Sequence, residues 1–295
     1  MPELPETETL ARDLHASLIG RTIDRVEAPH ADVLRGVRSA RSLARRLAGR
    51  KFTRVFRRAK AVVLRAEKTG SDAISRKRGQ TPFPEMASDP VYIVVVPRFT
   101  GGLLIREAGV PDDHYDCLRF RLTDHTTLAY RDVRRLGTVT LLDADEFVDL
   151  DRRLGKEPLD PGFTAIVLSA SLRSSHQQVK KLLMDQRRIA GVGNIYANEA
   201  LWAAGIDPSR PGDSISDAEA SKLRDELVDV LERSIRARGT TFRDYRDARG
   251  ERGGFVEQLK AYGRGGLPCL RCGTRLTMTH AIDGRATVFC HRCQS

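Results

Sequence analysis

Four of the five cysteines stand in two closely spaced pairs near the C-terminus. Cys269 pairs with Cys272 and Cys290 with Cys293, and seventeen residues separate the two pairs. This spacing is typical of a tetrahedral zinc site carried on a β-hairpin. Two disulfides are the competing interpretation, which is disfavoured for a protein expected in the cytosol. Four thiolates leave no open coordination position, so the sequence predicts one structural Zn2+ ion. The fifth cysteine, Cys117, is most simply a core thiol.

Positive charge is concentrated in one stretch of the chain. The formal net charge is +11 and the isoelectric point about 9.8. Residues 35–60 contribute eleven Lys or Arg and no Asp or Glu. A solvated basic face is the ordinary explanation of a charge run, but acidic residues usually interleave on such faces. We therefore expect a polyphosphate partner.

Membrane association and export are not expected. No apolar run reaches the roughly 20 residues that a membrane span requires. Three glutamates occupy the first eight positions, where a signal peptide would be basic and then apolar. The sequence therefore predicts a soluble cytoplasmic protein.

The first six residues combine an unusual nucleophile with two carboxylates. Once Met1 is removed, Pro2 carries an N-terminal secondary amine, which loses its proton closer to neutral pH than a lysine side chain does. Such an amine can attack a carbon that bears two heteroatoms and form an iminium ion. Glu3 could protonate the departing group, while Pro5 restricts the bending of the segment. Taken alone, these residues would also fit a frayed terminus.

The remaining pattern predicts a β-rich first half and a helical second half. Strand-like segments occur at residues 21–29, 52–56, 61–64, 91–96, 103–106, 117–122, 127–130 and 138–142. Helical periodicity occurs at residues 7–18, 39–47, 145–154, 171–184, 195–204 and 216–236. Several short strands favour a sandwich or barrel over a parallel sheet, so the expected class is α+β. Residues 67–90 are expected to form a long exposed loop, and residues 155–162 a linker.

A glycine-rich turn connects two of the predicted helices. Gly191 and Gly193 free the backbone, and Asn194 is expected to cap the helix that follows. The N–H groups at such a helix start can bind an anion, although an ordinary tight turn would share the pattern. The turn lacks the third glycine of a dinucleotide fingerprint and the Gly-Lys-Ser/Thr of a Walker A loop. In a chain this basic, a bound phosphate is the favoured interpretation.

Taken together, these residues resemble the formamidopyrimidine-DNA glycosylase family, also called the Fpg/Nei family. The motifs are PELPETET at residues 2–9, RRAK at 57–60, YRDVRRLG at 130–137, LGKEPL at 154–159, the turn at 183–200, GTT at 239–241, YGR at 262–264, and the cysteine pairs. Leu4, where the endonuclease VIII branch usually has Gly, makes the terminus similar to the purine-specific branch.

The resemblance implies a division into four parts. These are an N-terminal catalytic β-sandwich at residues 1–143, a helical linker at 144–162, a helix-two-turn-helix DNA-binding domain at 163–262 and a zinc finger at 263–295. Members of the family are base-excision-repair enzymes that bind double-stranded DNA containing damaged bases or abasic sites. A monomer associated with the nucleoid through DNA is expected.

The resemblance also implies a mechanism. A glycosidic carbon inside a stacked duplex is inaccessible to a protein amine, so the damaged base must be flipped out. Pro2 would then attack C1′ and displace an oxidised purine, such as 8-oxoguanine or a formamidopyrimidine, with Glu3 as proton donor and later acceptor. The Schiff base would allow β- and then δ-elimination to cut the strand. Lys60 and Arg285 would complete the catalytic set by holding the phosphates that flank the flipped nucleotide.

The DNA contacts carried over from the family differ in what they would bind. Asn194 and Lys180 would bind the backbone near the lesion, and Glu6 would lie in the base pocket. Arg134 would enter the helix and face the orphaned cytosine, and a loop at residues 239–254 would close over the oxidised purine. The full set is Glu6, Phe99, Arg134, Leu136, Lys180, Asn194, Thr240, Thr241, Tyr245 and Arg252.

The chain departs from the family at its wedge residues. Phe99 replaces the methionine that fills the void left by the flipped base, and Leu136 replaces a phenylalanine, with Val133 in place of a proline. Apolar wedges of either kind can unstack a base step, so the role can survive with the aromatic and aliphatic positions exchanged. Val96 and Pro97 stand in place of His-Leu, and a proline would remove a donor from a strand ladder.

Three other functions fit parts of the sequence. The same chemistry could act on oxidised pyrimidines, as in the endonuclease VIII branch. A catalytically silent damaged-DNA-binding protein would keep the DNA clamp but not an intact Pro2, Glu3 and Lys60. A zinc-finger RNA-binding protein would leave the N-terminal motif unexplained.

Overall fold

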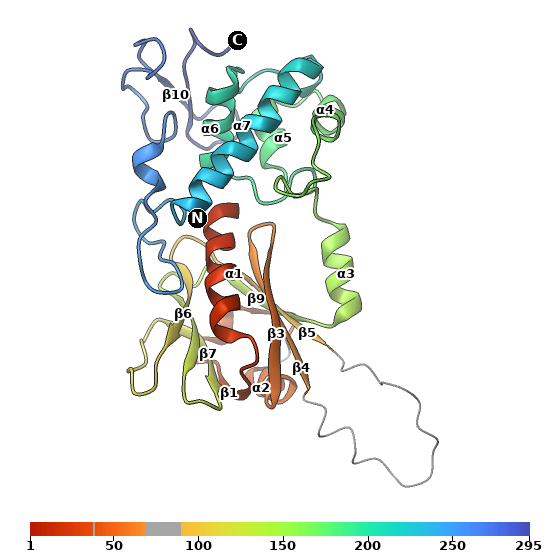
Figure 1. The fold of residues 1–295 in the computed structure, drawn as a ribbon, viewed down its shortest axis with the longest axis vertical. Coiled ribbons are helices and arrows are strands. Elements are labelled where there is room, and N and C mark those ends of the chain that lie inside the picture. The colour runs from red at the N-terminus through yellow and green to blue at the C-terminus, as the bar shows by residue number, and fades with distance from the viewer. Residues whose placement is uncertain (38, 69–89) are drawn as a thin grey trace.

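The fold was analysed in a computed structural model, which describes residues 1–37, 39–68 and 90–295. Figure 1 shows a β-rich N-terminal domain, a helical domain above it and a small hairpin at the C-terminal end. The expected α+β class is therefore confirmed. The loop predicted at residues 67–90 falls almost entirely outside the described residues, and its first two residues belong to a strand.

Two sheets form the N-terminal domain. One has the order β2-β9-β5-β4-β3 and the other the order β1-β7-β8-β6. The strands are β1 Ile23–Glu27, β2 Leu34–Arg35, β3 Arg50–Arg58, β4 Ala61–Lys68, β5 Val91–Val96, β6 Gly101–Arg106, β7 Asp116–Leu122, β8 Thr127–Asp132 and β9 Thr138–Leu142. One apolar core takes side chains from both sheets, and the rings of Phe52 and Phe120 meet there edge to face with centroids 6.5 Å apart.

The first helix, α1 (Leu4–Leu18), belongs to both domains. Leu10, Leu14 and Leu18 are fully buried in the core of the sandwich, as their spacing predicts. Leu4, at the other end, is buried in the core of the helical domain. The predicted start at residue 7 is wrong, because Glu3 and Glu6 cap the helix and a proline is tolerated in its first turn.

The second half of the chain is helical, with one break that the sequence pattern did not predict. The helices are α3 Ala144–Arg152, α4 Ala165–Arg173, α5 Val179–Met184, α6 Asn194–Ala204 and α7 Asp217–Arg236, with short 3-10 turns at Gly212–Ser214 and Phe255–Gln258. A further 3-10 turn, Ala31–Val33, lies in the N-terminal domain. The single helix expected at residues 171–184 is wrong. Ser174 and Ser175 bond to the nearby backbone, and Val179 N donates to Arg210 O at 2.7 Å.

The C-terminal hairpin pairs β10 (Thr277–Thr279) with β11 (Thr287–Phe289). It packs on α6 through a small core that contains Trp202, Leu276 and Val288 together with two of the cysteines. α2 (Ala40–Leu47), which Ser39 caps, lies at the opposite end of the molecule (Figure 1). Within the described ranges, no helix has the length and apolar character to cross a membrane.

Candidate active site

The N-terminal segment is held at the junction of the two domains. Pro2 is buried, and Leu4 N donates to Gly191 O at 3.0 Å. Gly191 has a φ of +86°, and a Cβ on it would come within 2.8 Å of the Leu4 side chain, so the approach requires glycine. The glycine-rich turn therefore fixes the position of the residues that follow Pro2.

The Glu3 carboxylate points at the start of α6. Its Oε1 accepts a hydrogen bond from Ile195 N at 3.1 Å, so the partial positive charge of the helix start stabilises the carboxylate. A Cβ on Gly193 would lie 2.2 Å from the carboxyl carbon of Glu3. The second oxygen, Oε2, is buried and has no hydrogen-bond partner in the described part of the chain. That oxygen can therefore exchange a proton with a group bound beside Pro2.

The helix cap at this turn is not the predicted one. Gly193 caps α6, and Asn194 is its first helical residue. The side chain of Asn194 instead donates to Ala286 O on the C-terminal hairpin at 3.0 Å. The predicted cap is therefore wrong, because the Asn194 amide is used to hold the finger and the Glu3 carboxylate occupies the helix start.

The Glu6 carboxylate links three segments. Its Oε1 accepts hydrogen bonds from Tyr196 Oη at 2.5 Å and Thr240 N at 2.8 Å, and its Oε2 accepts one from Glu3 N at 2.8 Å. Tyr196 Oη also lies 2.6 Å from Ser234 Oγ. Burial raises the pKa of Glu6, and the nearby charge of Glu3 raises it further. The sequence analysis missed the supporting roles of Tyr196 and Ser234. The position of Tyr196 just after the glycine-rich turn could have pointed to its role, but no sequence signal pointed to Ser234.

Lys60 projects from the tight β3–β4 hairpin toward the same place. Burial lowers the pKa of Lys60, Glu3 opposes this effect and Arg285 adds to it, so the three side chains lie in one electrostatic neighbourhood. The preceding residue, Ala59, has a φ of +52°, and its N–H donates to Glu157 Oε1 at 2.7 Å. The hairpin tip is thus fixed to the segment after α3.

The two arginines before Ala59 do not face the cavities as unpaired charges. Arg57 bonds to Glu8 and Glu157, and Arg58 to Glu157 and Asp151. Their charges are therefore balanced within the protein, and the expectation that the whole basic stretch serves a polyphosphate ligand is wrong for these two residues. Their task is to anchor the hairpin that presents Lys60.

Two cavities meet at Met1 and Pro2. The first has a volume of about 600 Å³ and is lined by Lys60, Arg98 and Arg285 together with apolar side chains of β4, β5 and α3. The second, of about 510 Å³, is lined by Glu6, Phe99, Thr240, Tyr245 and aromatic residues that include Phe242 and Tyr262. Met1 and Pro2 therefore line both cavities.

The loop at residues 239–254, which is predicted to close over the oxidised purine, contributes residues to the lining of the second cavity. Thr241 Oγ1 donates to Tyr245 O at 3.1 Å and accepts from Gly253 N at 2.9 Å, which closes the loop on itself. Tyr245 Oη donates to Glu6 O at 3.2 Å, whereas Arg252 is exposed. Sequence reasoning missed Phe242, which is 45% exposed at the cavity mouth and directly follows the GTT motif.

Two apolar side chains and an arginine stand together on the N-terminal domain. Phe99 and Leu136 are 45% and 41% exposed, and the guanidinium of Arg134 lies 5.0 Å from the centre of the Phe99 ring. Phe99 has a φ of +37°, so its backbone is held in the left-handed region. Pro97 follows β5 and removes no donor from that strand, whose last residue, Val96, still pairs with Thr138. The expected loss of a ladder donor at Pro97 is therefore wrong.

Lys180 is placed differently from the other predicted DNA contacts. Its side chain is fully buried, and its ammonium donates to Thr287 Oγ1 at 2.7 Å and Asp283 Oδ1 at 3.4 Å. Burial lowers the pKa of Lys180, although Asp283 opposes this effect. Lys180 thus holds the hairpin that carries the exposed Arg285, and a direct phosphate contact would have to displace these partners.

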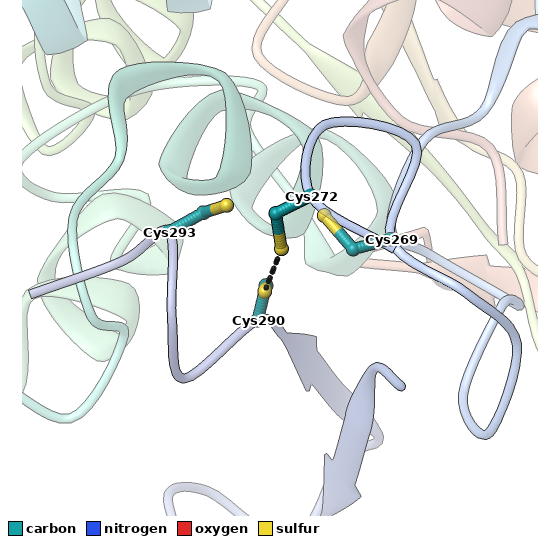
Figure 2. A group of neighbouring side chains, drawn as sticks. All are labelled: Cys269, Cys272, Cys290 and Cys293. Atoms are coloured by element: carbon teal, nitrogen blue, oxygen red, sulfur yellow. Dashed lines mark hydrogen bonds between the residues drawn. The ribbon is translucent and has the colours of Figure 1, made fainter. Parts of the chain in front are cut away.

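The four cysteines converge as the spacing predicts (Figure 2). Their sulfurs all lie within 4.8 Å of one another, and the Sγ atoms of Cys272 and Cys290 are 3.5 Å apart. Zn–S bonds of about 2.3 Å in a tetrahedron place sulfurs about 3.8 Å apart, so the four thiols fit a zinc ion. Cys117 is buried in the sandwich core, as expected.

Comparison with known proteins places the whole chain in one family. Residues 1–139 match the formamidopyrimidine-DNA glycosylase N-terminal domain, residues 154–246 the H2TH domain of the same enzymes, and residues 266–295 a zinc finger found in FPG and IleRS. The chain belongs to the formamidopyrimidine-DNA glycosylase family. It is a DNA glycosylase of base excision repair, with a zinc-finger domain.

Relatives of similar length support this membership. The formamidopyrimidine-DNA glycosylase of Moorella thermoacetica is 40% identical over 94% of this chain and 93% of its own length, and that of Geobacillus kaustophilus is 35% identical over the full length of both. Lactococcus lactis Fpg bound to DNA with an N7-benzyl-Fapy-dG superposes with a TM-score of 0.84 at 28% identity, covering both chains completely. MutM of Thermus thermophilus superposes with a TM-score of 0.80 at 32% identity, covering 99% of this chain and 98% of its own.

Proposed function

We propose that this glycosylase removes oxidised purines, such as 8-oxoguanine and formamidopyrimidines, from duplex DNA and then cleaves the strand by β,δ-elimination. The observation that supports this most is the geometry around Pro2. A buried proline at the end of the chain stands beside a carboxylate with one oxygen left without a partner among the described residues, at the meeting point of two cavities.

The first chemical step uses Pro2 and Glu3. The nitrogen of the processed terminus attacks C1′ and loses its proton, and the glycosidic bond breaks with its electron pair leaving on the base, which takes up a proton. The C1′–O4′ bond of the sugar then opens, O4′ takes up a proton, and C1′ and the proline nitrogen form an iminium ion. Glu3 Oε2 moves the proton at this centre, because Oε1 is already bound to Ile195 N. Loss of the deoxyribose 2′ proton from the resulting iminium ion then breaks the C–O bond to the 3′ phosphate, and a second elimination releases the 5′ phosphate.

Phosphate binding positions the DNA for this step. Lys60 and Arg285 line the cavity at Pro2, and both carry donors that suit phosphate oxygens. The burial that lowers the pKa of Lys60 is offset when a phosphate binds, because a nearby negative charge favours the ammonium form. Asn194 and Lys180 act by holding the finger hairpin against α5 and α6.

Base selection is assigned to the second cavity. Thr240 N and Tyr245 Oη each donate to Glu6 there, and Phe242 and Tyr262 supply aromatic faces. Phe99 and Leu136 are the wedges that keep the duplex open, and Arg134, stacked on Phe99, faces the unpaired base opposite the lesion. Thr241 and Arg252 shape and close the loop. Four cysteine thiolates would hold one zinc ion in a closed site with a structural role.

The bound DNA in solved relatives agrees with this assignment. A mutant of the Lactococcus lactis enzyme has been crystallised with Fapy-dG-containing DNA, and the Lactococcus lactis enzyme has been crystallised with DNA containing an abasic site. We therefore propose that this chain acts as a monomer on double-stranded DNA with the same two kinds of damage, within the cytoplasm and its nucleoid.

The deciding experiment is borohydride trapping. Processed, zinc-loaded protein is incubated with an 8-oxoguanine:cytosine duplex and sodium borohydride, and the adduct is located by mass spectrometry. We expect a covalent adduct on Pro2. An adduct on Lys60, or strand cleavage with no adduct, would contradict the choice of nucleophile.

A parallel incision assay addresses the substrate. The 8-oxoguanine duplex is compared with one that contains thymine glycol, at equal enzyme concentration. We expect faster incision of the purine lesion. Faster incision of thymine glycol would move the assignment to oxidised pyrimidines, and binding to both duplexes without incision would leave a silent damage-binding protein.

A further inference from the structure

Part of the basic stretch at residues 35–60 lies far from the active site. α2 carries Arg41, Arg45 and Arg46, which we call the α2 arginine cluster. Figure 1 shows α2 beside the C-terminal end of α1, at the end of the N-terminal domain away from the helical domain. α1 starts at the active site and has 15 residues, so it separates the cluster from Pro2 by about 22 Å.

The helix has one buried side and one arginine side. Leu43 and Leu47 are fully buried in the sandwich core, whereas all three arginines are exposed. Residues four apart share a helix face, so Arg41 and Arg45 project side by side away from the core. Because the apolar side of α2 is already covered, it has no surface to insert into a membrane.

The three arginines of the cluster have no acidic partner among the described residues, unlike several arginines on the strands of the same domain. No carboxylate in the described ranges lies within salt-bridge distance of its three guanidinium groups. By contrast, Arg119 pairs with Asp116 and Arg121 with Glu27. Like charges four residues apart destabilise a helix, so folding alone gives no reason to place Arg41 and Arg45 together.

We propose that the α2 arginine cluster is a second DNA-binding surface, which holds a duplex segment other than the one in the active site. Guanidinium groups suit this ligand, because their forked donors bind phosphate oxygens in pairs. Contacts of this kind carry no sequence information, so the second segment can be undamaged. A protein that touches two segments at once can pass from one to the other without being released.

The test measures binding of a second duplex to a protein whose active site is already filled. Processed, zinc-loaded, full-length protein is saturated with an unlabelled duplex that contains a tetrahydrofuran abasic-site analogue. A fluorescent undamaged duplex is then titrated, and its anisotropy is followed at several salt concentrations.

Three variants isolate the cluster. R41Q/R45Q/R46Q should weaken the second binding event at least tenfold and reduce its log–log salt slope by about 2.7, since each lost phosphate contact is worth about 0.9. R41K/R45K/R46K keeps the charge and should keep most of the slope. R152Q/R173Q/K222Q removes the same charge from exposed positions on α3, α4 and α7, and should change the affinity less than twofold.

Several results would overturn the proposal. The first is the absence of a second binding event in the unmodified protein. The second is an equal loss of affinity in the α2 and control variants. The third is an R41Q/R45Q/R46Q protein that binds the second duplex like the unmodified protein and has the same melting temperature. Tighter binding of oligoglutamate than of duplex DNA to the saturated protein would reassign the cluster to an acidic protein partner.

Discussion

Replacing Gly193 by alanine tests whether the close approach of α6 to Glu3 sets the rate of base excision. The new Cβ would lie 2.2 Å from Glu3 Cδ and 2.5 and 2.6 Å from its two oxygens. To reach an ordinary contact of 3.4 Å, the carboxyl carbon must retreat by about 1.2 Å. A displacement of about 1 Å at a reacting group can cost about 100-fold in rate, so we expect a loss of that size.

The backbone itself does not oppose the substitution. Gly193 has a φ of −132°, which any residue adopts, and replacing a glycine cap by alanine costs at most about 1 kcal/mol of stability. The protein should therefore fold, and its affinity for a tetrahydrofuran duplex should stay within about threefold, because Lys60 and Arg285 are untouched.

The assay is single-turnover incision of an 8-oxoguanine:cytosine duplex, with the melting temperature as a check on folding. Gly102→Ala is the matched control, since no atom lies within 4 Å of its added Cβ. Glu3→Gln completes a double-mutant cycle. If Gly193→Ala acts through Glu3, it should lower the incision rate of the Glu3→Gln protein only slightly further. Incision by Gly193→Ala within threefold of the unmodified rate would refute the reasoning.

Three further predictions concern the groups that support the site. Lys180→Met leaves the buried Asp283 carboxylate without its cation and should lower the free energy of unfolding by about 3 kcal/mol, measured by urea denaturation. Chelation of zinc should shift the emission of Trp202, the single tryptophan, because its ring packs in the core of the finger; an unchanged spectrum after metal loss would contradict this packing. Tyr196→Phe removes a buried donor to Glu6 and should cost about 2 kcal/mol, again measured by urea denaturation.

Local patterns predicted the elements that depend on local physics. The spacing of Leu10, Leu14 and Leu18 predicted the buried face of α1, and the paired cysteines predicted the cluster in Figure 2. The leucine pattern lies within one short segment, and the cysteine pairs have a spacing that is characteristic of zinc sites, so both can be recognised without knowledge of the fold. The start of α1 was missed because its cap uses Glu3, which is not among the usual capping residues.

What the sequence could not predict are contacts between distant residues. Tyr196 reaches Glu6 across 190 positions, and Arg58 reaches Asp151 across 93. No spacing rule connects such residues, so the arginines of the RRAK motif look like DNA ligands until their carboxylate partners are seen. The break between α4 and α5 was missed for a similar reason, because it is stabilised by a bond from Val179 to Arg210.

The catalytic segment is positioned by both domains at once. Leu4 packs in the helical core while Leu10 and Leu14 pack in the sandwich, so α1 cannot follow one domain without straining its contacts with the other. Glu3 is attached to this helix, yet its carboxylate is bonded to α6. The helical domain therefore holds Glu3 against α6, while the rest of α1 follows the sandwich. Because the residues that we propose to contact DNA also lie on both domains, we expect a duplex bound across them to hold Pro2 and Glu3 in one arrangement.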